Sequence, residues 1–269
     1  RDGQLRVGWR IRPGMMRREL GYFLGAVGFF TRLPVPGWVG HSAAALSQCA
    51  RYFPAVGLLV GGIGALVYWL ALHLWPQPVA VLLSMAATLY ATGAFHEDGL
   101  SDTADGLGGG WDKARILAIM KDSRVGSYGV VALVLALLGK FALLSGIDAA
   151  LVPAALLAGH AVSRLCATLI MATLDYARDD ESSKARPATS RPSLASLLLA
   201  AGFALLPLFV LPLAKALAGI VLAALAAAWL AGKFRRWLGG YTGDCLGAVQ
   251  QVTEVAFYLG FFAQWSRVI

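Results

Sequence analysis

The chain has 269 residues, of which 58% are hydrophobic and only 14% charged, and its mean hydropathy is +0.66. These values exclude an ordinary soluble domain and predict a polytopic membrane protein. Its three cysteines, Cys49, Cys166 and Cys245, are isolated from one another. Neither a disulfide framework nor a thiolate metal site is therefore indicated.

The N-terminal part of the chain is basic and then briefly apolar. Residues 1–19 carry six arginines and are predicted to be a cytoplasmic tail that binds anionic lipid. Residues 20–36 are short and are interrupted by Arg32, Pro34 and Pro36, which predicts an interfacial or re-entrant helix, with an eighth span as the alternative. Residues 20–269 as a whole are predicted to form one integral-membrane domain.

The predicted fold is an all-α, polytopic transmembrane helix bundle with about seven spans. Each span is an apolar run of about 20 residues, the length that crosses a bilayer as a helix. Gly57 and Gly61 lie four residues apart in the first span, which predicts close helix packing in lipid. The seven predicted spans are 53–73, 78–95, 127–146, 151–174, 194–211, 213–232 and 246–263.

The positive charge of the chain is distributed unevenly between the two sides of this bundle. The tail has six Lys and Arg residues, segments 96–126 and 175–193 have four each, and segment 233–243 has three, whereas the opposite loops offer only Lys215. The positive-inside rule then places the polar loops in the cytoplasm. The net charge of +8 is explained by topology, and no nucleic-acid partner is expected.

Five ionisable side chains lie within ten residues after the second apolar run. If this segment is helical, Asp98, Asp102 and Asp105 fall at i, i+4 and i+7, on one face. Like charges so arranged repel unless a cation lies between them, and oxygen-only ligands favour Mg²⁺, with Mn²⁺ as an alternative. Glu97 points about 100° away and ranks lower as a ligand. The alternative interpretation is a solvated acidic helix end.

Three further polar segments lie on the same predicted side. Segment 121–129 offers Asp122 as a further metal ligand and Lys121 and Arg124 as phosphate ligands, although an ordinary positive-inside flank is the alternative. Segment 175–187 is a candidate lid or headgroup-binding loop, or else a solvated connector. Asp244, flanked by glycines, returns a carboxylate to this side, and Arg32 is a further candidate for a phosphate contact.

Three charged residues lie inside predicted spans. Lys140 is far from the cytoplasmic side and is interpreted as snorkelling outward. Arg164 and Glu254 each lie about 10 residues, or roughly 15 Å, below the cytoplasmic ends of their helices. We expect them to neutralise one another at the floor of a cavity that opens to the cytoplasm, either as a structural ion pair or as a substrate contact.

The sequence resembles the cobalamin synthase family, the adenosylcobinamide-GDP ribazoletransferases, over nearly all of the chain beyond the tail. The resemblance implies a Mg²⁺-dependent enzyme of the bacterial inner membrane with its site facing the cytoplasm. It implies transfer of the cobinamide phosphate from adenosylcobinamide-GDP to α-ribazole or its 5'-phosphate, with release of GMP. It leaves open a homo-oligomer or association with other enzymes of the pathway. The matching segments are FFTRLPVP (29–36), RYFPAVG (51–57), HEDGLSDTADG (96–106), KDSRVGSYG (121–129) and TGDCLGA (242–248).

On this resemblance, residues 20–269 form the catalytic domain and its polar residues take hypothetical roles. A metal would be held by Asp98, Asp102 and Asp105, completed by Asp122 or Asp244, with Glu97 as a lesser candidate. Asp122 would accept the proton of the attacking hydroxyl, with His96 as the alternative base. The candidates for substrate binding are Lys121, Arg124, Ser127, Arg178, Arg164 and Arg32.

Three other functions fit parts of the pattern. A CDP-alcohol phosphotransferase or a prenyltransferase also uses Asp-rich helices with Mg²⁺, but each expects a further Asp motif that this chain lacks. A transporter would use the intramembrane Lys140, Arg164 and Glu254 as a path. Against that alternative, the charges gather at one side rather than at the midplane, and the Asp-rich segment is not repeated.

Overall fold

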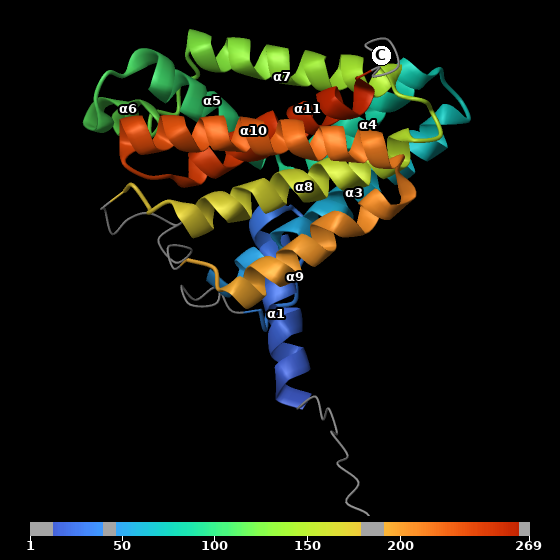
Figure 1. Cartoon of the computed structure of the whole chain (residues 1–269), viewed down its shortest axis with the longest axis horizontal. Coiled ribbons are helices and arrows are strands. Elements are labelled where there is room, and N and C mark those ends of the chain that lie inside the picture. The colour runs from blue at the N-terminus through green and yellow to red at the C-terminus, as the bar shows by residue number, and fades with distance from the viewer. Residues whose placement is uncertain (1–12, 40–46, 179–190, 264–269) are drawn as a thin grey trace, which may run out of the picture.

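The computed structural model describes residues 13–39, 47–178 and 191–263, which form helices and contain no β-strand. The helices run in the order shown in Figure 1. They are α1 (Pro13–Phe30), the 3₁₀-helix η1 (Ala50–Tyr52), α3 (Phe53–Leu72), α4 (Gln77–Thr92), α5 (Phe95–Gly109), α6 (Lys113–Ile119), α7 (Ser127–Gly146), α8 (Val152–Thr173), α9 (Leu194–Leu205), the 3₁₀-helix η3 (Leu206–Val210), α10 (Leu213–Leu238) and α11 (Gly243–Phe262).

Helix α8 lies at the centre of the bundle. In its most apolar stretch 78% of the residues are buried, against 17% in α7 and 22% in α10. Figure 1 shows α10 and α11 running lengthwise beside α8 and α7 lengthwise beyond them, with α5 and α6 gathered at one end. Helices α7 and α10 therefore form the outside of the bundle, where their exposed Leu and Val side chains face lipid.

Helices α3 and α8 approach each other very closely. A Cβ atom at Gly61 would lie 2.8 Å from the backbone oxygen of Leu156, and one at Gly57 would overlap the backbone of His160. The interpretation of these two glycines as packing residues is confirmed. Without side chains at the contact, van der Waals packing between the two backbones can hold the helices together in lipid.

Four helical segments in the described residues are long and apolar enough to cross a membrane, and the predicted count of about seven is not confirmed. Ser47–Leu72, Ser127–Gly146, Val152–Thr173 and Leu213–Leu238 match four predicted spans. The predicted span 194–211 is divided between the short helices α9 and η3. The last one, 246–263, forms the 20-residue α11, whose glutamines and Glu254 make it less apolar than the four.

The predicted span 78–95 ends early at a sharp corner. Helix α4 stops at Thr92, and α5 leaves at an angle of 86° to it. Gly93 and Ala94 both take left-handed conformations there, with φ of 65° and 58°. The segment after α1 supports the corner, because Arg32 donates its backbone N–H to the Ala91 carbonyl at 2.8 Å. A fifth span exists only if α4 and α5 are counted together.

Helix α1 begins inside the predicted basic tail, at Pro13, and ends at Phe30. Figure 1 shows it extending away from the bundle, crosswise to α7 and α10. Glu19 of α1 forms an ion pair with Arg51 at 3.3 Å, which joins the helix to the start of α3. Residues 1–12 of the tail lie outside the described residues, and an interfacial position for residues 20–36 stays a prediction.

Exposed aromatic side chains mark the two ends of the bundle. Trp69 and Trp75 lie at the α3–α4 connection, and Trp111 and Tyr128 lie at the opposite end, beside the start of α7. Aromatic belts of this kind are typical of the two membrane–water interfaces. The end with Trp111 and Tyr128 also carries the acidic helix, and we refer to it as the site end.

Candidate functional site at one end of the bundle

Helix α5 carries the acidic side chains in three different environments. The segment is helical, as the i, i+4, i+7 spacing requires, so Asp98, Asp102 and Asp105 lie along one side of it. Asp98 is exposed, Asp102 is half-buried and Asp105 is buried. The three predicted metal ligands therefore differ in how accessible they are from outside the protein.

Asp105 is bonded to the start of α7. Its two carboxylate oxygens accept backbone N–H groups of Gly126 at 2.7 Å and Gly129 at 2.9 Å. The first turn of a helix has N–H groups without partners inside the helix, and a carboxylate there also interacts favourably with the helix dipole. Asp105 therefore acts as a cap that connects α5 to α7.

Asp244 approaches α5 from the first turn of α11. A Cβ atom at Gly99 would lie 2.8 Å from the Asp244 backbone oxygen and 3.2 Å from the Gly247 Cα, so only glycine permits this contact between helices. Thr242 caps α11 by accepting the Cys245 N–H at 3.2 Å. The charges of Asp98, Asp105 and Asp244 all act on Asp102, so these carboxylates lie within electrostatic range of one another.

Arg178 provides a positive charge beside these carboxylates. Its guanidinium contacts the Asp244 carboxylate at 2.7 Å. The chain after α8 is held there by a parallel β-bridge, in which Tyr241 donates its N–H to Asp175 and accepts the N–H of Ala177. Burial, and to a smaller extent Asp98, raise the pKa of Asp244, while Arg178 and the Thr242 hydroxyl act to lower it.

The second predicted polar cluster lies apart from this group. Asp122 and Arg124 form an exposed ion pair at 2.6 Å, and hydrogen bonds from Arg124 lower the pKa of Asp122 to about 2. Among the described residues, no hydrogen bond or ion pair joins Asp122 to an α5 carboxylate. Lys121 and Ser127 are exposed on the same segment.

His96 and Glu97 point into the bundle instead of toward the site end. The His96 ring is buried and stacks on Phe30 with 5.4 Å between ring centroids. The Glu97 carboxylate is also buried and accepts a hydrogen bond from the Gln251 amide at 2.8 Å. Neither side chain faces the space where the other carboxylates meet.

Arg164 and Glu254 act on one another electrostatically, as predicted, but they do not form a direct ion pair. Glu254 is paired with Lys140 at 3.0 Å, and Arg164 donates to the backbone oxygen of His160 at 3.0 Å. The prediction that Lys140 snorkels outward is wrong, because its side chain is buried against Glu254. Glu254 inside the bundle gives this lysine a closer counter-charge than the membrane surface does.

Residues that sequence reasoning missed complete this interior. Gln250 and Gln251 of α11 both form hydrogen bonds between side chains there. The sequence signal for these interior hydrogen bonds was the pair of adjacent glutamines inside an apolar run, because amides are costly to bury without partners. Arg32 is exposed at the α4–α5 corner, with its side chain against Gly93, at the opposite end of α5 from Asp105.

The donor set at the site end fits a hard divalent cation. Within the described residues, no three His, Cys, Asp or Glu side chains are arranged as a formed metal site. Magnesium, however, usually takes only one or two carboxylates and completes its shell with phosphates and water. Asp98 and Asp102 accept no hydrogen bond in the part of the chain that the structure describes, and the charges of Asp98 and Asp244 both act on Asp102, so oxygen ligands are at hand.

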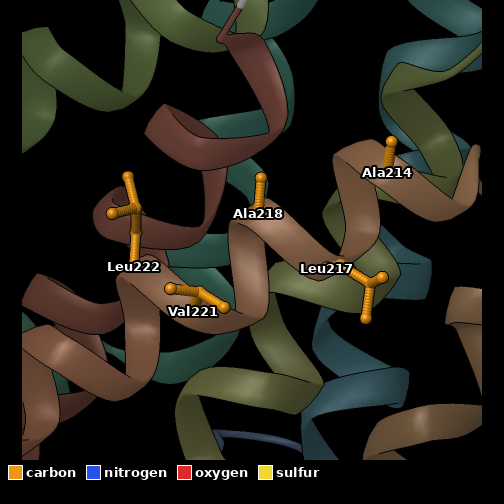
Figure 2. Close-up of a pocket in the computed structure, with 5 residues that line it drawn as sticks. All are labelled: Ala214, Leu217, Ala218, Val221 and Leu222. Atoms are coloured by element: carbon orange, nitrogen blue, oxygen red, sulfur yellow. The ribbon is translucent and has the colours of Figure 1, made fainter. Parts of the chain in front are cut away.

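A separate hollow lies on the membrane-facing side of α10. Figure 2 shows its five lining residues on successive turns of that helix. Its volume is about 250 Å³, and its lining has no ionisable group, which excludes it as a place for charged chemistry. The lining residues are Ala214, Leu217, Ala218, Val221 and Leu222.

The fold and the site together define a helical integral-membrane protein with a group of carboxylates and an arginine at one end of its bundle. Residues 22–262 match the family model described as cobalamin-5-phosphate synthase. The chain belongs to this family, whose members are enzymes of cobalamin synthesis. This assignment replaces the phosphotransferase, prenyltransferase and transporter alternatives.

Similar proteins support the same assignment. An adenosylcobinamide-GDP ribazoletransferase of Shewanella woodyi is 46% identical over 251 residues, covering 91% of this chain and 96% of its own. The protein of that name from Leptothrix cholodnii is 48% identical over 259 residues, with the same coverage of both chains. A third, from Shewanella frigidimarina, is 47% identical over 256 residues. No solved structure matches the chain.

Proposed function

We propose that this chain joins adenosylcobinamide-GDP to α-ribazole, or to α-ribazole 5'-phosphate, and releases GMP. The 5'-hydroxyl would attack the phosphorus bound to cobinamide, and the bond from that phosphorus to the GMP oxygen would break. The observation that carries the proposal is the close packing of α5 at Gly99, next to Asp98, against the backbone of Asp244, whose carboxylate is paired with Arg178. Relatives that carry this name and cover 91% of the chain support it.

In this proposal the residues at the junction bind the diphosphate. Asp98, Asp102 and Asp244 would hold Mg²⁺, with Mn²⁺ as an alternative, and the ion when bound would neutralise charge that develops on the leaving phosphate. Arg178 would contact a phosphate oxygen, because a guanidinium matches its geometry. The N-terminus of α11 beside Asp244 adds backbone N–H groups that favour an anion.

The proton of the attacking hydroxyl needs an acceptor. His96 is not carried into this role, because it is buried against Phe30. Asp122 is ionised at neutral pH, but its pKa of about 2 makes it a weak base, and Arg124 occupies its carboxylate. For Asp122 to be the base, bound substrate would have to exchange this ion pair and draw segment 121–129 toward the α5 carboxylates, with Lys121 and Arg124 then turned to phosphate oxygens.

The proposed environment is the bacterial inner membrane, with the site end in the cytoplasm. The basic residues of α6 and of the last turns of α10 lie at that end, as the positive-inside rule requires. Nucleotide substrates would then reach the site from the compartment in which they are made.

The test is a turnover assay with purified protein in nanodiscs, given adenosylcobinamide-GDP, α-ribazole and Mg²⁺. We expect release of GMP, loss of activity with EDTA, and at least a hundredfold decrease for Asp244→Asn, on the order of the larger losses seen when charge-stabilising groups are removed. Asp148→Asn, at the other end of the bundle, is the matched control and should retain activity. Absence of GMP release, or full activity of Asp244→Asn, contradicts the proposal.

A further inference from the structure

The interior of the bundle contains a buried polar network that the proposed chemistry does not use. We define it as Glu97, Lys140, Gln250, Gln251 and Glu254, all of them buried. It joins α5, α7 and α11. Its contacts are Lys140 to Glu254 at 3.0 Å, Lys140 to Gln251 at 3.3 Å, Gln251 to Glu97 at 2.8 Å, Gln251 to Gln250 at 2.7 Å and Gln250 to Glu254 at 2.6 Å.

Gln251 occupies the central position in this network. Its amide oxygen accepts from the Lys140 ammonium, and its amide nitrogen donates to the Glu97 carboxylate. The Gln251 amide thus connects the buried Lys140 ammonium to the buried Glu97 carboxyl group, which Lys140 does not contact directly. Among the described residues the second Glu97 oxygen is buried without a hydrogen-bond partner, so the Gln251 bond is the side-chain hydrogen bond that holds this group against α11.

Glu97 is the residue directly before Asp98. At the other end of α5, Asp105 is fixed by the N–H groups of Gly126 and Gly129. Two inward-facing carboxylates therefore fix the acidic helix at both ends. Rotation about its own axis or sliding along α11 would break both of these attachments.

We infer that the Glu97–Gln251–Lys140 contact is a positioning device, which fixes the rotation and depth of α5 so that Asp98 and Asp102 face Asp244. Glu97 and Gln251 do not touch the reacting atoms and act through the orientation of the neighbouring aspartates. Partners behind metal ligands commonly change metal affinity about 10–100-fold when they are removed. The inference rests on the proposed function only for its activity measurement.

The test replaces the central amide by an apolar side chain of similar size. Gln251→Leu leaves both Glu97 oxygens without partners, and we expect the Mg²⁺ concentration for half-maximal GMP release to rise about tenfold. Hydrogen–deuterium exchange of the α5 amides should become faster in the same variant, without substrate or metal. Gln251→Asn keeps the amide but shortens its reach, and should shift both measurements in the same direction if the leucine variant does not fold.

Two further variants separate positioning from general loss of stability. Gln77→Leu removes an amide that bonds the Leu144 and Ile147 carbonyls at the opposite end of the bundle, and should change neither measurement. The double variant Glu97→Gln with Gln251→Glu reverses the hydrogen bond and brings a carboxylate beside Lys140, and should restore both.

Failure of the positioning role can be distinguished from failure of the proposed function. Three results would overturn the positioning role. They are unchanged hydrogen–deuterium exchange of α5 in Gln251→Leu, an equal shift in the Mg²⁺ requirement in Gln77→Leu, and a double variant that is as impaired as Gln251→Leu. If the wild-type protein releases no GMP, the proposed function fails, and the exchange measurement still decides whether Gln251 fixes α5.

Discussion

At the scale of single residues, the aspartates of α5 divide into two kinds. Asp98 and Asp102 accept no hydrogen bond within the described residues and share their surroundings with Asp244, whereas both oxygens of Asp105 are bonded to backbone N–H groups. Two backbone hydrogen bonds hold the Asp105 side chain in one position. The same residue type thus has a proposed binding role at two positions and a structural role at the third.

This division predicts that Asp105→Ala acts mainly on stability. Loss of the cap leaves the Gly126 and Gly129 N–H groups without partners, and we expect the free energy of unfolding to fall by about 1–2 kcal/mol. Thermal unfolding in detergent measures the effect. Asp102→Asn is the comparison and should not lower the unfolding temperature, because burial and the neighbouring carboxylates already disfavour the charge of Asp102; equal destabilisation of the two variants would contradict the assignment.

Arg178 leads to a prediction about pH. Since Arg178 lowers the pKa of Asp244, its removal in Arg178→Gln raises that pKa further. A metal ligand must be deprotonated, so activity is present above this pKa and is lost as the pH falls through it. We expect the acid limb of the profile of kcat/KM against pH to move to higher pH.

Arg191→Gln is the matched control for that experiment. Arg191 also contacts an aspartate, Asp175, at 2.8 Å, but this pair is exposed and the carboxylate is not one of the proposed ligands. Its profile should coincide with that of the wild type. A shift of the same size in both variants would mean that general surface charge, and not the contact with Asp244, sets the acid limb.

The spacing of the aspartates predicted their common helix, but not their separate roles. The partners of Asp105 lie 21 and 24 residues further along the chain, and the partner of Glu97 lies 154 residues away. Periodicity within one helix carries no information about contacts at such separations. For the same reason Lys140, judged only by its depth in α7, was interpreted as snorkelling.

At the scale of elements, spans with clear boundaries were predicted well. Helix α7 has the predicted bounds, 127–146, because Gly126 precedes it and Gly146 ends it. The predicted second span failed because Gly93 and Ala94 turn the chain inside an otherwise apolar run. Gly93 directly after an apolar helix is a helix-end signal, but a left-handed alanine has no sequence signature.

The corner between α4 and α5 gives two substitutions with opposite effects. Ala94→Gly removes the steric cost of a left-handed alanine, and we expect it to stabilise the protein by about 1 kcal/mol. Gly93→Ala should destabilise it, because φ is 65° there and the new Cβ would lie 2.5 Å from the Arg32 Nε atom. Thermal unfolding of both variants tests this, and changes of the same sign would contradict the description of the corner.

At the scale of the whole molecule, charge and aromatic side chains distinguish the two ends. The carboxylates, Arg178 and the basic end of α10 lie at the site end, and the connections after α3 and α7 lie at the other. The composition predicted a membrane bundle, and the orientation indicated by the Lys and Arg counts stays a prediction. The number of spans was not predictable by counting apolar runs, since α9 is short and α11 contains amides and a carboxylate.

The orientation can be tested with single cysteines, because Cys49, Cys166 and Cys245 are all buried. Ala114→Cys in α6 and Ala150→Cys before α8 place exposed thiols at the two ends. We expect a membrane-impermeant maleimide to label Ala114→Cys in inverted vesicles and Ala150→Cys in spheroplasts. The reverse pattern would place the site end outside the cytoplasm.

The length of α10 connects the site to the thickness of the bilayer. Its apolar part, residues 213–232 before the basic last turns, extends about 30 Å, the thickness of the hydrocarbon core of a typical membrane. A thinner bilayer would create a hydrophobic mismatch, to which such a helix responds by tilting. The chain passes from the end of α10 to Asp244 in six residues, so tilting shifts the segment that brings this carboxylate to α5. We therefore expect the acyl-chain length of the lipids to affect how Asp244 is placed against α5. Reconstitution in short-chain lipids would then alter activity through this placement as well as through the solubility of the protein.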